Sequence, residues 1–143
     1  MNLSWAARQQ LVSARVRQRC EYCRMHQELQ GAVFHVEHIV PRKLGGSGEL
    51  DNLAWACPGC NLTKASRVTL WDPLTGQEVR MFHPRQDRWT EHFAWQGYEL
   101  VGLTPIGRAL IDAFTLNHPR RIRIRQVEER FGLFPPAEQE HSS

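Results

Sequence analysis

The residues best suited to chemistry in this sequence are four cysteines, arranged in two pairs of identical spacing. Cys20 and Cys23 form the first pair, and Cys57 and Cys60 form the second, each with two residues between the thiols. Two thiolates in a tight turn can face one ion, and two such turns complete a tetrahedral sulfur site, for which zinc is the expected metal. Redox pairs, disulfides and free buried thiols are the alternatives, and nothing in the sequence points to an oxidising compartment that would favour disulfides. We therefore predict one structural zinc ion.

A zinc ion held by both pairs would make residues 24–56 a closed unit, because the chain must leave one point and return to it. Within this unit, residues 32–40 alternate apolar and polar positions as a strand does, and Pro41 ends the pattern. A second short strand is expected at 53–56, and a helix is expected to begin at Asn61, which could cap it. This frame of strand, loop, strand and helix must position whatever chemistry the cysteines enclose.

Candidate catalytic residues lie on this frame. Glu37 and His38 are neighbours in the first strand, and their side chains can converge only where the strand bends, which Pro41 and the glycine-rich loop after it would allow. A neutral imidazole beside a metal-binding carboxylate is the arrangement needed to deprotonate water and deliver it to phosphorus. The side-chain oxygen of Asn61 could complete a divalent-metal site with Glu37.

Each of these residues also has a simpler interpretation. Alone, His38 would be an ordinary surface or core histidine, and Glu37 a solvated strand carboxylate. Asn61 would be a helix cap and Asn52 a turn residue. Their joint placement around two cysteine turns is what favours a site. His35, on the same strand face as Glu37, is expected either to support a ligand or to be an exposed strand residue.

Composition bounds the class of protein. The chain has 143 residues, with 18 Lys and Arg against 15 Asp and Glu, for a net charge of +3. This length fits one domain or a small module with attached elements. No apolar run approaches the roughly 18 residues of a membrane span, and the first residues lack an apolar signal core. We therefore expect a cytoplasmic protein without a membrane partner.

The flanks supply further elements. Ser4 can cap a helix, and Thr104-Pro105 opens another. The basic segment 120–127 is either a solvated face or a DNA-binding arm, and the first is favoured because two glutamates follow it. The five tryptophans could stack bases, but at this density they more often build a small core. The predicted parts are an N-terminal helix (1–18), a central module (19–70), an α+β extension (71–130) and a disordered tail (131–143).

In order and spacing, these motifs resemble the HNH endonuclease family, which has the ββα-metal fold. The resemblance is closest to the four-cysteine zinc-knuckle subtype and to small stand-alone bacterial members, and it covers roughly residues 19–68. The segments that carry it are Cys20-x2-Cys23, His35–Pro41, Gly45-Gly46, Leu50–Leu53 and Cys57–Lys64. It implies an α+β fold with a central ββα-metal module, an N-terminal helix and a C-terminal α+β extension.

The resemblance also implies a role for each site residue. His38 matches the general base, and Asn52 matches the asparagine that pins the connecting loop. Glu37 and Asn61 match the ligands of a catalytic divalent ion, which would be Mg²⁺, Mn²⁺ or Ni²⁺. Glu37 stands where aspartate is commonest, a departure that bears on metal preference. The implied reaction is hydrolysis of a DNA phosphodiester that leaves a 5′-phosphate and a 3′-hydroxyl.

Phosphate contacts need lysine and arginine side chains near the site more than they need a high net charge. The best candidates in the sequence are Arg42, Lys43, Lys64 and Arg67. The expected partner is double-stranded DNA, and cutting both strands with one active site per chain would often need a homodimer. The rival hypothesis is a non-catalytic zinc-knuckle module that binds nucleic acid or a protein partner, and a thiol redox protein is a third.

Overall fold

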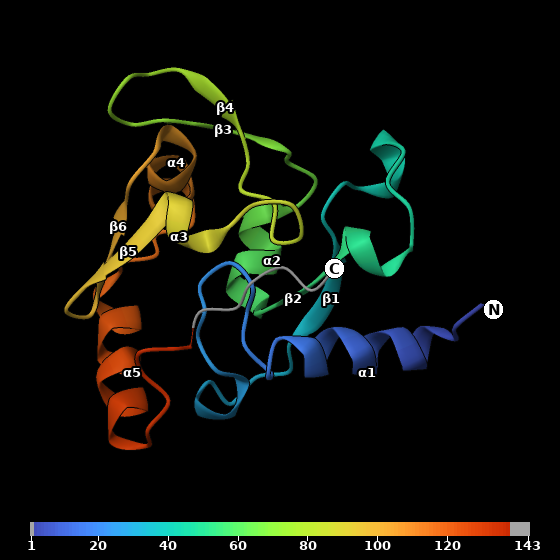
Figure 1. The fold of residues 1–143 in the computed structure, drawn as a ribbon, viewed down its shortest axis with the longest axis horizontal. Coiled ribbons are helices and arrows are strands. Elements are labelled where there is room, and N and C mark those ends of the chain that lie inside the picture. Colours follow the sequence, from blue (N-terminus) through green and yellow to red (C-terminus); the bar gives the residue numbers. More distant parts are fainter. Residues whose placement is uncertain (1, 138–143) are drawn as a thin grey trace. The chain divides into compact units, whose positions relative to one another are not determined.

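The computed structural model describes residues 2–137, and the chain divides into two compact units, residues 1–66 and 67–143. Each unit combines helices with small antiparallel sheets (Figure 1), which confirms the predicted α+β class. The finer boundaries inferred from the sequence stay predictions. Of the tail predicted to be disordered, residues 138–143 lie outside the described residues.

The first unit holds the strand, loop, strand and helix that the sequence predicts. Its elements are α1 (Trp5–Arg15), a 3₁₀ turn (Gln27–Leu29), β1 (His35–His38), two further 3₁₀ turns (Arg42–Leu44 and Leu50–Asn52), β2 (Leu53–Ala56) and α2 (Pro58–Lys64). Strands β1 and β2 pair antiparallel, with Glu37 opposite Ala54 and His38 opposite Leu53. All four residues of β2 are buried, so β1 pairs with a strand that lies in the interior of the unit.

Strand β1 is shorter than the predicted 32–40. It has only the four residues of β2 to pair with, because β2 ends where the chain turns at Cys57. One further hydrogen bond, from Ile39 N to Asn52 O at 2.9 Å, continues the pairing beyond His38. The end of β1 is therefore held against β2 by regular backbone bonds.

Helix α2 begins earlier than the sequence predicts. Cys57 is its N-cap, with Sγ accepting a hydrogen bond from Cys60 N at 3.4 Å, and Pro58 occupies the first helical position. The prediction that Asn61 caps this helix is therefore wrong, because the cysteine turn itself forms the cap. Asn61 lies inside the helix, and Lys64 is three residues further on, so both side chains are on one side of α2.

Helix α1 begins as predicted at Ser4, whose Oγ accepts a hydrogen bond from Ala7 N at 3.1 Å. Val12 is fully buried and anchors the helix, which contacts both β1 and β2. Trp5, the first residue of the helix, is 42% exposed. The helix therefore belongs to the same compact unit as the ββα elements.

In its described residues, 67–137, the second unit contains two antiparallel hairpins and three helices. Its elements are β3 (Thr69–Trp71), β4 (Glu78–Arg80), α3 (Trp89–His92), β5 (Phe93–Gln96), β6 (Glu99–Gly102), α4 (Pro105–Ala113) and α5 (Pro119–Arg130). Thr104 caps α4 as predicted, its side chain accepting from Gly107 N. His118 caps α5, because its Nδ1 accepts a hydrogen bond from Arg120 N.

Buried charges tie this second unit together. Asp72 is fully buried, and Arg108 of α4 donates to both of its carboxylate oxygens, at 3.0 and 2.9 Å. Arg125, from the basic segment 120–127, is 1% exposed and lies 5.0 Å from the centroid of the Trp95 ring. Its Nη1 donates to Tyr98 O at 2.8 Å, so this arginine stabilises the unit's interior.

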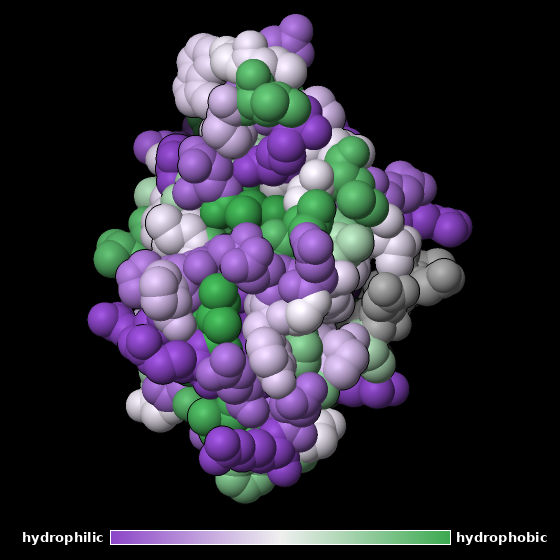
Figure 2. All heavy atoms as spheres, turned by 90° about the vertical axis from the view of Figure 1, so that its left-hand side faces the viewer, coloured by the Kyte–Doolittle hydropathy of each residue, from purple (hydrophilic) through white to green (hydrophobic). Residues whose placement is uncertain are grey.

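The described surface is mixed in character. On the face drawn in Figure 2, hydrophilic residues predominate and apolar side chains lie in small areas among them. Among the described residues, no helix has the length and apolar character needed to cross a bilayer.

Near the end of the described chain, Phe134 packs against Trp95 with ring centroids 4.9 Å apart.

Candidate active site and metal centre

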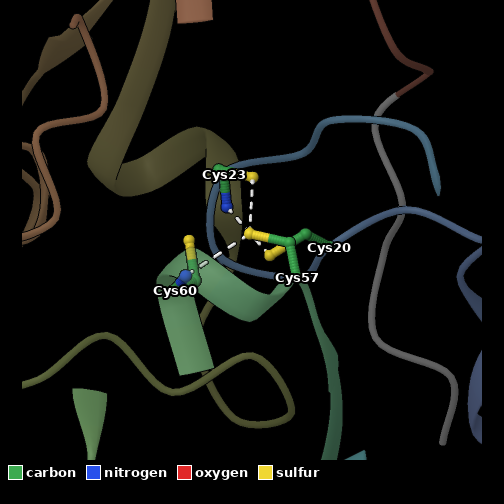
Figure 3. Close-up of side chains that lie close together, drawn as sticks. All are labelled: Cys20, Cys23, Cys57 and Cys60. Carbon is green, nitrogen blue, oxygen red and sulfur yellow. Dashed lines mark hydrogen bonds between the residues drawn. The ribbon is translucent and has the colours of Figure 1, made fainter. Parts of the chain in front are cut away.

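The four cysteines converge in the first unit. Cys20 and Cys23 come from the turn after α1, Cys57 from the end of β2 and Cys60 from α2, and their sulfur atoms point toward one another (Figure 3). All four thiols are buried and lie within 4.8 Å of one another, and Cys23 Sγ is 3.8 Å from Cys57 Sγ. A tetrahedral site with Zn–S bonds of about 2.3 Å requires sulfur atoms about 3.8 Å apart. The geometry therefore fits a zinc ion.

The pKa values of the four buried thiols also favour a bound cation. Burial raises the pKa of the Cys20 thiol, whereas hydrogen bonds from the other three thiols hold the pKa of Cys57 well below its usual range. Four thiols packed in a buried space cannot all ionise without a positive charge among them. A divalent metal ion would allow all four to ionise and bind as thiolates.

Glu37 is buried in a polar cluster of its own. The Tyr22 hydroxyl donates to Oε1, and Lys64 Nζ lies 3.1 Å from Oε2. The Glu37 side chain is 6% exposed and that of Lys64 is fully buried. Burial raises the pKa of Glu37, while the Lys64 charge and the Tyr22 hydroxyl oppose this shift. The carboxylate is thus matched by a cation that the protein itself supplies.

His38 lies one residue further along β1 and has different surroundings. Arg42 Nε donates to His38 Nε2 at 3.3 Å, so the proton of the neutral ring is on Nδ1. The Trp5 indole stacks on the imidazole, with ring centroids 6.1 Å apart and planes 9° from parallel. Burial, followed by the charges of Arg42 and Lys64, lowers the pKa of His38. A lowered pKa favours the neutral ring, which is the form that can act as a base.

Asn52 fixes the loop that follows β1. Its Oδ1 accepts from Val40 N at 2.9 Å, and its Nδ2 donates to Val40 O at 3.0 Å and to Ser47 O at 2.7 Å. Gly46 is required beside this contact, because a Cβ there would lie 1.7 Å from Val40 O. Asn52 thus bonds the loop after β1 at two places, Val40 and Ser47.

The proposed ligands of a catalytic ion are Glu37 and Asn61. Carboxylate and amide oxygens suit a hard divalent ion. In the part of the chain that the structure describes, the Asn61 amide has no hydrogen-bond partner. The two donor types suit such an ion, which would compete with Lys64 for the Glu37 carboxylate. Lys64 is placed to compete because it follows Asn61 by one helical turn.

The predicted phosphate contacts separate into three groups. Arg42 and Lys43 are exposed on the 3₁₀ turn directly after β1. Lys64 is fully buried, and its Nζ also donates to His38 O at 3.1 Å. Arg67 belongs to the second unit.

His35 of β1 is exposed, which matches one of its two expected roles, that of an exposed strand residue.

Two residues beside the candidate site were not predicted, Tyr22 and Trp5. Tyr22 lies between the first two cysteines, and its position within the Cys20-x2-Cys23 turn could have indicated that it lies near the site. Trp5 is far from His38 in sequence, and no motif connects the two. Only the packing of α1 brings the indole to the imidazole.

Comparison with known proteins agrees with this geometry. Residues 20–67 match the model of the family described as HNH endonuclease. Neither the curated proteins nor the solved structures give a match to this chain. The matched segment contains both cysteine pairs, Glu37, His38, Asn52 and Asn61. Residues 20–67 therefore form a domain of the HNH endonuclease family.

Proposed function

We propose that this protein is a metal-dependent HNH endonuclease that hydrolyses DNA phosphodiester bonds, with His38 as the general base, leaving a 5′-phosphate and a 3′-hydroxyl. The observation that carries the proposal is the state of His38. Its Nε2 accepts a hydrogen bond from Arg42 Nε, burial and that positive charge lower its pKa, and Asn52 bonds the loop that follows its strand. A lowered pKa keeps the ring able to take a proton from water at neutral pH.

Arg42 connects substrate binding to the base. In the free protein its guanidinium donates to His38 Nε2 and therefore occupies the lone pair that would receive the proton. A DNA phosphate is a stronger acceptor for guanidinium than a neutral imidazole is, because it is charged and can accept two bonds. Transfer of Arg42 to the phosphate would free Nε2 to deprotonate the attacking water.

Glu37 and Asn61 are the residues that would hold a catalytic divalent ion, Mg²⁺, Mn²⁺ or Ni²⁺. When bound, such an ion would neutralise charge on the scissile phosphate and on the leaving 3′ oxygen. Tyr22 orients the Glu37 carboxylate, and Lys64 holds both that carboxylate and the backbone of His38. The four cysteines would hold a separate, structural zinc ion that fixes the start of α2.

DNA, in double-stranded form, is the proposed substrate. Arg42 and Lys43 are the proposed phosphate contacts in the first unit, and Arg67 stays a candidate from the second. Lys64 would contact phosphate only if it left Glu37, because its ammonium already forms an ion pair with that carboxylate. A homodimer would supply two active sites for double-strand cleavage, and the proposed location is the cytoplasm.

Plasmid cleavage with Mg²⁺, Mn²⁺ or Ni²⁺, with and without chelator, tests this function. His38→Ala should lower the cleavage rate at least about 10²-fold without changing the zinc content. His35→Ala is the matched control, because His35 is an exposed histidine on the same strand, and this variant should cleave at the wild-type rate. Equal cleavage by His38→Ala and wild type would refute the assignment of the base.

The same experiment examines the rival function, a non-catalytic zinc module that binds nucleic acid or a protein partner. The observation in its favour is that Lys64 already neutralises Glu37, a residue that a catalytic site would reserve for metal. Binding of the plasmid without cleavage in all three metals would support the rival and contradict the nuclease.

A further inference from the structure

The N-terminal helix α1 lies outside the matched segment 20–67, yet it delivers an aromatic ring to the proposed general base. Trp5 is the first residue of this helix, and its indole is nearly parallel to the His38 imidazole. Trp5 is 42% exposed, so burial of its surface does not by itself account for its position. Its main aromatic neighbour is the one histidine to which we assign chemistry.

The position of α1 is fixed by hydrogen bonds to the segment that precedes and begins β2. Arg8 Nη1 donates to Gly48 O at 2.7 Å, and Arg15 Nη1 donates to Leu50 O at 2.9 Å. Arg15 also donates through Nη2 to Leu53 O. These are charge-assisted bonds to backbone carbonyls, a stronger class than neutral hydrogen bonds. The helix is therefore tied to the backbone at both ends of the segment 48–53.

The same segment is tied to the end of β1. Asn52 lies within it and bonds both polar backbone groups of Val40, two residues after His38. Helix α1, the segment 48–53 and the end of β1 therefore form one hydrogen-bonded assembly. Within it, Trp5 reaches His38 from one side while Arg42 holds Nε2 from another.

From this placement we infer that Trp5 is a positioning residue for His38, and that α1 is part of the active site. The inference rests on the proposed function, in which His38 is the base. A half-exposed imidazole held by one exposed arginine would change rotamer easily, and it would do so most when Arg42 leaves for the phosphate. The indole then remains as the contact that keeps the ring facing the substrate. Loss of orientation is costly, because catalysis depends on reacting groups being held in place.

Steady-state cleavage by the full chain tests the inference with three variants. Trp5→Ala should lower kcat roughly three- to tenfold, the factor expected from one aromatic contact, and leave KM unchanged. Trp5→Phe keeps an aromatic face and should recover most of the lost rate. Trp71→Ala is the matched control, since Trp71 is a 61% exposed tryptophan of the second unit and should be neutral. If KM rises and kcat is unchanged, Trp5 stacks on substrate and the positioning role is overturned.

A measurement that needs no activity separates this inference from the proposed function. Stacking on an indole shifts the ring-proton resonances of His38 upfield, and comparison with His38→Ala assigns those signals. Trp5→Ala should remove the shift while the far-ultraviolet circular dichroism stays unchanged, and Trp71→Ala should keep it. An unshifted His38 in the wild-type protein overturns the inference whether or not DNA is cut. Shifted resonances in a protein that cuts no DNA would contradict the proposed function alone.

Discussion

Lys64 Nζ lies 3.1 Å from Glu37 Oε2, and both side chains are buried. A lysine at a helix C-terminus usually extends into solvent, so full burial of this ammonium needs compensation. The Glu37 carboxylate and the His38 carbonyl supply it, both at 3.1 Å. One cation thus joins α2 to two successive residues of β1, and it does so where the catalytic carboxylate is proposed.

Removing this cation should destabilise the first unit. Lys64→Met keeps the length of the side chain but leaves Glu37 buried without its partner, a change that typically costs about 3–5 kcal/mol. The double variant Lys64→Met/Glu37→Gln should recover part of that loss, because a neutral amide replaces the unpaired charge. Denaturant unfolding of the zinc-loaded proteins measures both. A single variant as stable as wild type would mean that the ion pair is not formed in solution.

The cysteine cluster should bind about one zinc ion per chain, and this ion should stabilise the first unit. Cys57→Ser should reduce the bound zinc and lower the thermal stability of the first unit, because Cys57 is both a predicted ligand and the N-cap of α2. Metal analysis of the purified protein, followed by unfolding with and without a strong chelator, measures this. Wild-type protein that contains no zinc but forms two disulfides would contradict the prediction.

Asn52 should matter to catalysis more than to binding. Asn52→Ala removes three hydrogen bonds to Val40 and Ser47 and should lower kcat about 10²-fold through loss of orientation at the end of β1. Ser47→Ala is the control, because it keeps the carbonyl that Asn52 contacts and should leave the rate nearly unchanged. The two variants are compared by plasmid cleavage under saturating metal. Equal rates would exclude the pinning role.

The second unit should lose stability in acid through Asp72. Hydrogen bonds from Arg108 hold the pKa of this buried carboxyl well below its usual range. The stability that this lower pKa contributes is present above the unfolded-state pKa of about 4 and is lost as pH falls toward the folded-state value. Thermal unfolding between pH 7 and pH 3 should therefore show a decline below about pH 4 that Asp72→Asn reduces. Asp112→Asn, at an exposed position on α4, should decline like wild type.

Several helices and strands were predictable because local rules determine where they begin. Alternation predicted β1, and Ser4 and Thr104 were recognised as helix caps. The start of α2 was misplaced because a cysteine cap resembles an unstructured turn in sequence. Helix α5 follows the same local rules, because His118 caps it and proline favours the first position of a helix, where Pro119 lies.

By itself, the sequence determined the four thiols, the ββα order, and the identity of His38 and Asn52 as candidates, because spacing along the chain limits which of these groups can meet. The surroundings of those groups were decided only by the tertiary structure. Lys64 was predicted as a phosphate contact, yet in helix α2 its side chain is fully buried against Glu37. Trp5 reaches His38 because α1 is bonded to the segment 48–53. Contacts of this kind depend on how distant elements pack, and no spacing within a single motif encodes that packing.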